Sequence, residues 1–467
     1  MAQLLSSRIA PRIAAVLSLA ALLASSAAFA GPVFDTPAPF TGTVRFSGEK
    51  GTPAYSGAPV TAEGRGFAPQ QEITVLRGQT RLSPEGLKAD DKGGFSFSFD
   101  LPAEAATGLQ PIVVQTTKPD SADVIELQIS PKIPFSGAER YDITASKVAP
   151  GLYQVGYSAK NDALFVTSAA GRPPKIASKL LKLDPKSLKV IAEATPADAP
   201  AEGERPALPY AVYGIAVDDA NDTIWVSNTR QDTVAVYAQK DLSLVKQFPA
   251  GTVLHARDVV IDPVHGRAYA SAAMGNQVMV FDTKTLEPLA PISIASKVRG
   301  ERFTVLSLTL DAASNRLYAV SLSTPEVARI DLATGAAEIL SVPGAVRASG
   351  IAYDPKADRI FVASQGSDDL VGLDGKTGTV AFDTPVGAQA LNALFDPLTG
   401  HAYVMNRGSD SIAVVDGASG ALVANLDAGS FPNHGIVTAD GTVYAVNKAR
   451  GQDDSEGDQI WRIVPKK

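Results

Sequence analysis

The chain has 467 residues, of which 45% are hydrophobic and 19% charged, with 39 glycines, 32 prolines and no cysteine. This length allows two or three domains and a large core, while the absence of cysteine excludes disulfides, thiolate metal sites and cysteine nucleophiles. The formal net charge of −7 argues against broad electrostatic adhesion to nucleic acid or anionic lipid, so any anion site has to be local.

Residues 1–30 have the pattern of a secretory signal peptide. Arg8 and Arg12 precede the apolar segment Ile13–Leu23, and Ala28–Ala30 forms a small-residue cleavage site. A membrane anchor is the alternative, but the segment is short and rich in Ala and Ser. We therefore expect export to the periplasm, no transmembrane segment in the mature chain, and a mature net charge of −9 once the two arginines are removed.

Residues 31–40 are predicted to be an extended linker and residues 41–133 a separate all-β unit. Alternating apolar residues predict strands in five places: Thr43–Phe46, Ile73–Leu76, Phe95–Leu101, Pro111–Thr116 and Val124–Ile129. The runs 64–69, 89–90 and 93–97 resemble bacterial immunoglobulin-like modules, which implies a small β-sandwich that spaces or docks. Phe95, Phe97 and Phe99 are expected on one buried face, and Phe67 in the core.

After a linker at 134–140, the rest of the chain is a repeat whose clearest copy spans residues 390–429. Four short apolar runs in this copy are separated by turn residues, which is typical of a four-stranded antiparallel meander. The second strand of every copy begins near an aromatic residue, and after a wide first interval these lie about 41 to 49 residues apart. They are Phe165, Trp225, Tyr269, Tyr318, Phe361, Tyr403 and Tyr444.

That period is the one expected of a propeller blade, so residues 141–467 are predicted to form a seven-bladed β-propeller. The last copy supplies only three strands. We expect the segment Tyr141–Val148 to add the fourth, beside Gln459–Ile463, because closing the ring with both ends of the domain leaves no free sheet edge. The predicted fold class is all-β, a seven-bladed propeller preceded by an immunoglobulin-like sandwich.

The second strands also carry a four-residue signature, as in Trp225–Asn228, Tyr403–Asn406 and Tyr444–Asn447. The third strands end on Asp, and Thr-Gly or Ser-Gly turns follow at 334–335, 377–378 and 419–420. These features resemble the YVTN β-propeller family, and the signal peptide and ring length resemble its periplasmic YncE-like members. The resemblance covers about residues 140–467 and implies a fold, not an activity.

In a propeller, the loops between blades and the loops joining second to third strands gather at one end of the ring, here called the mouth. Because guanidinium groups bind phosphate and carboxylate in bidentate fashion, cations on these loops predict an anion site. The candidate ligand-binding residues are Arg205, Tyr213, Arg230, His255, Arg257, Arg302, Arg347, Arg407, His434 and Lys448.

The expected function is that of a non-enzymatic periplasmic binding or scaffold protein. Its ligand would be an anionic molecule such as a nucleotide, single-stranded DNA, an anionic glycan or a chelate, or an envelope protein. The same loops carry many acids, and Asp258 adjoins Arg257, so solvated ion pairs are the competing interpretation. Tyr153, Phe303 and Phe431 could stack a base or sugar at the mouth or belong to the core.

The alternative is an enzyme of the lactonase or quinoprotein-like class. Such enzymes need metal-binding acids or a quinone cage around the channel, and a cluster of His255 and His434 with an acid at a common metal position would favour this alternative. The sequence shows no nucleophile motif, no phosphate loop and no acid at a recognisable ligand spacing. The acidic run Asp453–Asp458 lacks the register of a calcium-binding loop. No cofactor and no metal are expected.

Overall fold

The computed structural model describes residues 36, 38–171, 176–201 and 207–466; the predicted signal peptide lies outside them. Two sheets form the N-terminal part. The first has the strand order β1-β2-β5 and the second the order β4-β3-β6-β7. Their bounds are β1 Thr43–Ser47, β2 Pro59–Arg65, β3 Glu72–Arg77, β4 Thr80–Arg81, β5 Phe95–Asp100, β6 Gly108–Thr117 and β7 Ser121–Ile129, with a short 3-10 helix η1 at Glu49–Gly51.

Burial alternates along these strands, so each sheet has one buried face. Phe95 and Phe97 are buried on β5 as predicted, although Phe99 is only half-buried. Phe67 is buried too, with its ring centroid 5.4 Å from that of Phe95, which confirms the core interpretation. Sequence reasoning missed β2. A Cβ on Gly64, in this strand, would lie 2.0 Å from the Phe95 ring, so this glycine makes room for the aromatic side chain. The immunoglobulin-like assignment stays a prediction.

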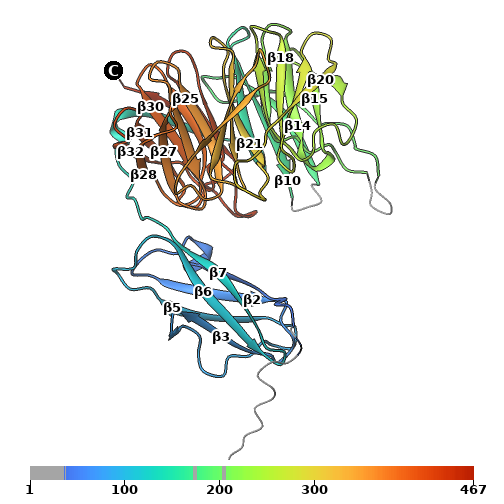
Figure 1. The fold of residues 1–467 in the computed structure, drawn as a ribbon. Helices are drawn as coiled ribbons and strands as arrows, with labels where there is room; N and C mark the ends of the chain where they lie inside the picture. The colour runs from blue at the N-terminus through green and yellow to red at the C-terminus, as the bar shows by residue number, and fades with distance from the viewer. Residues whose placement is uncertain (1–35, 37, 172–175, 202–206, 467) are drawn as a thin grey trace, which may run out of the picture. The chain divides into compact units, whose positions relative to one another are not determined.

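Seven four-stranded antiparallel sheets follow in the described residues, each a propeller blade (Figure 1). Blade 1 holds β9 Leu152–Ser158, β10 Ala163–Ala170, β11 Ala177–Leu183 and β12 Val190–Ala194; blade 2 β13 Ile215–Asp218, β14 Thr223–Asn228, β15 Thr233–Ala238 and β16 Leu244–Gln247; blade 3 β17 Ala256–Asp262, β18 Arg267–Ala272, β19 Gln277–Asp282 and β20 Pro288–Ser293. Blade 4 holds β21 Val305–Asp311, β22 Arg316–Ser321, β23 Glu326–Asp331 and β24 Ala337–Ser341; blade 5 β25 Ala348–Asp354, β26 Arg359–Ser364, β27 Asp369–Asp374 and β28 Val380–Pro385; blade 6 β29 Ala390–Asp396, β30 His401–Asn406, β31 Ser411–Asp416 and β32 Leu422–Asp427.

Blade 7 joins the two ends of the propeller. It consists of β33 His434–Val437, β34 Val443–Val446, β35 Gln459–Pro465 and β8 Tyr141–Lys147. Two short 3-10 helices lie outside the strands: η2 at Ala138–Arg140, just before β8, and η3 at Thr229–Gln231, between β14 and β15. Strand β8 pairs with β35 from Tyr141 opposite Pro465 to Lys147 opposite Gln459. The predicted closure is therefore confirmed.

The first strands of the blades form the inner ring. Each contacts the first strand of the next blade, from β9 through β13, β17, β21, β25 and β29 to β33, and β33 contacts β9 again. The circuit is closed, as a propeller requires. These seven strands therefore surround the axis, and the loops at their ends surround its two openings.

The aromatic residue of each second strand packs between blades. Trp225, Tyr318 and Tyr403 are fully buried, and the Phe361 ring stacks on that of Phe395 in the next blade with centroids 5.2 Å apart. Burial of such side chains contributes about 1.5–3 kcal/mol each, which explains why the aromatic position recurs in every copy.

The asparagine that ends the second-strand signature has a separate role. The side-chain amide of Asn406 donates to the carbonyl of Val386 at 2.7 Å, and that of Asn447 donates to the carbonyls of Ala428 and Glu456 at 2.8 and 2.7 Å. Both amides are buried. The signature thus satisfies backbone carbonyls in the loops beside the second strand.

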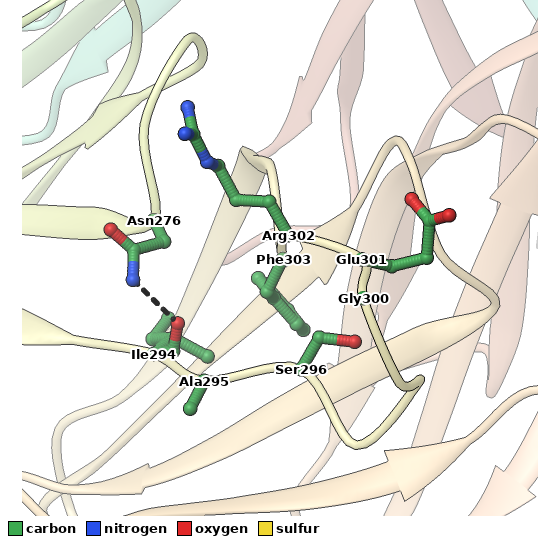
Figure 2. Close-up of a pocket in the computed structure, with 8 residues that line it drawn as sticks. All are labelled: Asn276, Ile294, Ala295, Ser296, Gly300, Glu301, Arg302 and Phe303. Atoms are coloured by element: carbon green, nitrogen blue, oxygen red, sulfur yellow. Dashed lines mark hydrogen bonds between the residues drawn. The ribbon is translucent and has the colours of Figure 1, made fainter.

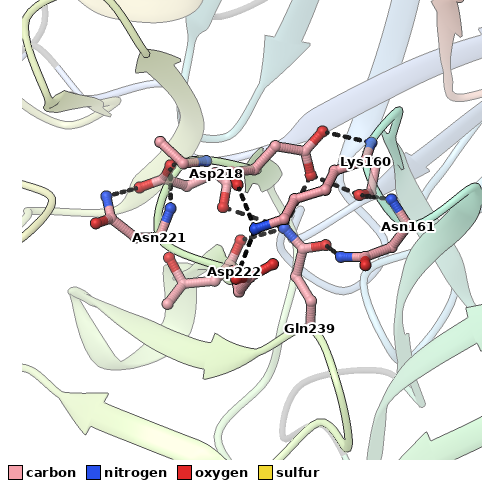
Figure 3. Close-up of polar contacts among 10 residues, drawn as sticks. Lys160, Asn161, Asp218, Asn221, Asp222 and Gln239 are labelled. Carbon is pink, nitrogen blue, oxygen red and sulfur yellow. Dashed lines mark hydrogen bonds and ion pairs between the residues drawn. The ribbon is translucent and has the colours of Figure 1, made fainter.

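Polar groups connect the blades at the end of the ring opposite the mouth (Figure 3). Between blades 1 and 2, Lys160 donates to the carboxylate of Asp222 at 2.7 Å, and Asn161 donates to the side chain of Gln239 at 2.7 Å. Gln239 in turn donates to the carbonyl of Asp218 at 3.1 Å. The charges and amides of this network satisfy one another.

Candidate functional site

The two predicted sets of loops do meet at one end of the ring. The backbone amides that follow second strands donate to the loops that lead into first strands: Ala273 to His255, Gln365 to Arg347, and Arg407 to Gln389. These hydrogen bonds are 3.4, 3.2 and 3.0 Å long. The mouth defined from the sequence is therefore a continuous rim of paired loops.

A cavity of about 520 Å³ lies inside the inner ring and is lined by the first strands of all seven blades. Its wall is largely aliphatic, with polar groups contributed by Asp258, Asn392 and His434. The Oδ1 atom of Asn392 is buried and has no hydrogen-bond partner among the described residues. The central channel thus offers a ligand apolar surface and one unsatisfied polar atom, Oδ1 of Asn392.

Three half-buried cations, here called the cation cluster, gather at the mouth: Arg257, Arg407 and Lys448. The Nζ atom of Lys448 lies 3.9 Å from the centre of the Tyr153 ring, and the guanidinium carbon of Arg407 lies 4.9 Å from that of Phe431. In the described part of the chain, none of the three forms an ion pair with a carboxylate, and Nη1 of Arg257 is buried without a hydrogen-bond partner. Aromatic faces, not acids, therefore support the charges of Lys448 and Arg407.

Titration of these cations reflects their proximity. Burial, together with the charge of Arg407, lowers the pKa of Lys448 to about 8. Burial also lowers the pKa of Arg407, and Arg257 acts in the same direction. The charged forms of Arg407 and Lys448 are thus disfavoured, so both have a favourable electrostatic interaction to gain from a bound anion.

Asp258 and Arg257 form no ion pair among the described residues, although Arg257 shifts the pKa of Asp258 toward lower values. The Asp258 carboxylate accepts hydrogen bonds from the backbone amides of Leu308 at 3.0 Å and Val259 at 3.2 Å, and from the side chain of Gln154 at 3.4 Å. Burial raises the pKa of Asp258, which favours its neutral form. The acid that adjoins the cluster in sequence is thus engaged with the channel wall.

Other acids of the mouth cap backbone amides across blade boundaries. Asp232 accepts from the amide of His255 at 2.7 Å, Asp368 from Gln389 at 2.7 Å, Asp410 from Phe431 at 3.1 Å and Asp458 from Gly151 at 2.8 Å. The four acids have φ values between 53° and 61°, a left-handed conformation that Asp tolerates. Because each acid belongs to one blade and each amide leads into the next, this repeated contact joins the blades. Sequence reasoning missed it, although an Asp just before the third strand was a visible signal.

The tyrosines and histidines line the same region. Tyr213 is buried with its ring centroid 4.3 Å from that of Tyr153, and burial raises its pKa to about 12, with nearby Arg230 acting in the opposite direction. Burial and then Arg257 lower the pKa of His434 to about 3, and its Nδ1 accepts from the amide of Val155 at 3.4 Å. Burial lowers the pKa of His255, and Arg230 and Arg257 add to this effect. Both histidines are therefore neutral at pH 7.

The structure thus links Tyr213, Arg230, His255, Arg257, Arg407, His434 and Lys448 by direct contact or electrostatic influence. Two further candidates lie in other surroundings. Arg302 is at a separate cavity of about 440 Å³ beside Asn276 and Ile294, where Figure 2 shows its side chain and that of Glu301 pointing in different directions. Arg347 is exposed and acts on the carboxylate of Asp368. Arg205 lies outside the described residues.

Of the remaining aromatic candidates, Phe303 is fully buried and belongs to the core. Phe431 is half-buried, and Arg407 and Arg450 both approach its ring, with guanidinium carbons 4.9 and 4.4 Å from the ring centre. Arg450 is also bound by both carboxylate oxygens of Asp410 at 2.6 Å. It is therefore already paired, unlike the cation cluster.

The described residues contain no group of three His, Asp or Glu side chains arranged to hold a metal ion. The arrangement that would have favoured the enzyme alternative, His255 and His434 with a shared acid, is thus not present in that part of the chain. Nor do the described residues include a helix that is long and apolar enough to span a bilayer.

The fold defines a β-propeller, and the cation cluster lies at one end of its ring. No family model matches the chain. A curated relative, the uncharacterized protein YncE of Salmonella typhi, is 24% identical over 302 residues, covering 54% of this chain and 82% of its own length.

Solved structures support the same architecture. They include hydrazine synthase from Kuenenia stuttgartiensis, 19% identical with a TM-score of 0.53 over 65% of this chain and 94% of its own. A streptogramin B lyase is 13% identical, also with a TM-score of 0.53, over 71% of this chain and 100% of its own. At these identities the likeness shows the fold alone.

Proposed function

We propose that this protein is an exported binding protein that holds a phosphate- or carboxylate-bearing ligand at the mouth of its propeller. The observation that carries the proposal is the cation cluster, three half-buried positive charges without a carboxylate partner among the described residues. Charged structural side chains that are withdrawn from water are normally paired. A group of cations left unpaired is instead a candidate site for an anion supplied from outside.

The geometry suits a small polyanion or an anionic group on a larger molecule. Each hydrogen bond from a guanidinium or ammonium to an anion contributes about 1.5–3 kcal/mol, so three cations correspond to an affinity between about millimolar and micromolar. The faces of Tyr153 and Phe431 are already occupied by Lys448 and Arg407, which holds both cations in place before the ligand arrives. Such preorganisation reduces the cost of binding. A nucleotide, an anionic glycan, a chelate or an acidic segment of an envelope protein all present this chemistry.

The test is the double variant Arg257→Gln, Arg407→Gln, with calorimetric titration of AMP at low ionic strength. We expect the affinity to fall by about 100-fold, which corresponds to two lost charge-assisted hydrogen bonds, while the melting temperature is unchanged. Glutamine keeps much of the side-chain bulk and removes the charge.

The matched control is Arg302→Gln, Arg347→Gln, which removes the same charge from the same end of the ring. It should change AMP affinity less than threefold, because neither residue is tied to the cluster by a described contact. An equal loss in both double variants would show that only net charge matters, and failure of the wild type to bind AMP or any other anion tried would refute the site.

Export remains part of the proposal. The signature of residues 1–30 and the likeness to YncE support it. Fractionation of cells that express the full chain should place it in the periplasm with Gly31 as its first residue. A cytoplasmic protein that retains Met1 would contradict this.

A further inference from the structure

Lys448 forms no ion pair with an acid in the described residues, in contrast to several other lysines of the propeller. Lys160, Lys179 and Lys246 each lie within 2.7 to 3.3 Å of a carboxylate oxygen. The Nζ atom of Lys448 instead faces the Tyr153 ring at 3.9 Å, and the side chain forms no ion pair in the described residues. A neighbouring carboxylate stabilises the ammonium form of a lysine. An aromatic ring combined with cationic neighbours stabilises that form much less.

The backbone of Lys448 is held by hydrogen bonds to the neighbouring loop. Lys448 follows the second strand of blade 7, and its amide donates to the carbonyls of Ser430 and Phe431 at 3.1 and 3.2 Å. The nearby carboxylate of Asp458 accepts instead from the amides of Gly151 and Ala449, at 2.8 and 3.1 Å. Thus the nearest acid is directed to the backbone, while the amine is held beside Arg407.

We propose that the ε-amino group of Lys448 condenses reversibly with aldehydes or 2-oxo acids whose anionic group is held by Arg257 and Arg407. This inference rests on the proposed function and narrows its ligand to a carbonyl-bearing anion. A lysine that is half-buried next to another cation is the usual setting for an imine-forming amine, because an appreciable fraction is neutral near pH 8.

The step balances without any further reactant. The lone pair of Nζ attacks the carbonyl carbon, and a proton moves from nitrogen to oxygen to give a carbinolamine. The hydroxyl group then takes up a proton and leaves as water, the C=N bond forms, and the nitrogen releases its remaining proton to the solvent when the imine is neutral. Addition of water reverses the sequence. The anionic group stays at the guanidinium groups throughout, so it raises the local concentration of the carbonyl at the amine.

The experiment uses the full mature chain with pyridoxal 5′-phosphate, an anionic aldehyde, and pyridoxal, its form without phosphate. Imines are reduced with borohydride and located by peptide mass spectrometry. We expect pyridoxal 5′-phosphate to label Lys448 at least about tenfold faster than the ion-paired Lys179 at pH 7.5, because a larger share of Lys448 is unprotonated. Pyridoxal should label Lys448 much more slowly than the phosphorylated aldehyde does.

Two variants separate this inference from the proposed function. Lys448→Arg keeps a cation in the cluster but cannot form an imine, so it should lose the label. Arg257→Gln with Arg407→Gln should reduce phosphate-dependent labelling to the rate seen with pyridoxal. If Lys448 reacts no faster than Lys179 while AMP still binds, the imine is refuted and the anion site stands. Equal labelling of Lys448 by both aldehydes would overturn the proposed role of the arginines in the step.

Discussion

The two ends of the propeller ring contain the same kinds of charged residue and use them differently. At the end opposite the mouth, Arg267 lies 2.6 Å from a carboxylate oxygen of Asp282, and His265 lies 2.7 Å from one of Asp262. At the mouth, the acids cap backbone amides, while the cation cluster has no acid partner in the described residues. The number of charged residues therefore does not identify a binding site, whereas the group that each charged side chain contacts does.

Of the substitutions that test this comparison, replacement of Asp458 should have the largest effect on stability. Its Oδ1 accepts amides from Gly151 and Ala449 and so joins blade 7 to blade 1, where the ring closes. Asp458→Ala removes two charge-assisted hydrogen bonds and leaves two amides unpaired, which should lower the free energy of unfolding by about 2–4 kcal/mol. Urea denaturation measures this loss.

The control is Asp453→Ala in the same loop, because Asp453 is exposed. It should leave the free energy of unfolding within about 0.5 kcal/mol of the wild type. If Asp458→Ala is equally harmless, the mouth acids are not structural caps, and their negative charge has to be counted against the cation cluster after all.

Much of the fold could be predicted from the sequence because its signals are local and repeated. The aromatic of each second strand and the Asp-capped turns recur in copy after copy, and the turns have a clear physical basis. Asp374, for example, accepts from the amide and hydroxyl of Thr377 at 2.7 and 2.8 Å, and Gly378 then adopts a φ of 71°. The pairing of β8 with the last blade could also be predicted, because the last copy of the repeat supplies only three strands.

The site was predictable only in outline. Topology places Arg302 and Arg347 on mouth loops as surely as Arg257 and Arg407, but the direction of each side chain depends on its neighbours in space. The contact between Lys448 and the Tyr153 ring brings together residues from opposite ends of the propeller sequence, and no rule of sequence spacing predicts it. Likewise, Asp258 looked like a partner for Arg257 because it is adjacent in sequence, while its carboxylate bonds to Leu308 in the next blade.

A smaller effect concerns the pH dependence of anion binding. The pKa of Lys448 is about 8 in the free protein, and a bound anion favours the ammonium form, so the pKa is higher in the complex. Affinity for AMP should therefore fall by up to about fivefold as the pH rises from 8 to 9. The phosphate group of AMP, His255 and His434 do not change charge over that interval.

Calorimetric titration of AMP across this range checks the dependence, and Lys448→Arg is the control. Arginine stays protonated at every pH used, so the fall in affinity between pH 8 and 9 should disappear. A fall of the same size in the variant would assign the effect to another group and would remove Lys448 from the site.

The smallest expected effect concerns the change in stability when one cation is removed, which should differ in sign between the two ends of the ring. Lys160→Gln removes a cation that is paired with Asp222, so it should destabilise the protein slightly at low salt and not at all in 0.5 M NaCl, as a rough screening limit. Arg407→Gln removes a cation whose charge burial and Arg257 already disfavour, so stability should stay the same or rise. Urea denaturation of both variants at two salt concentrations measures this. A loss of stability in Arg407→Gln that salt abolishes would mean that Arg407 has an anionic partner within the protein. The contrast between the paired cations opposite the mouth and the cation cluster would then fail.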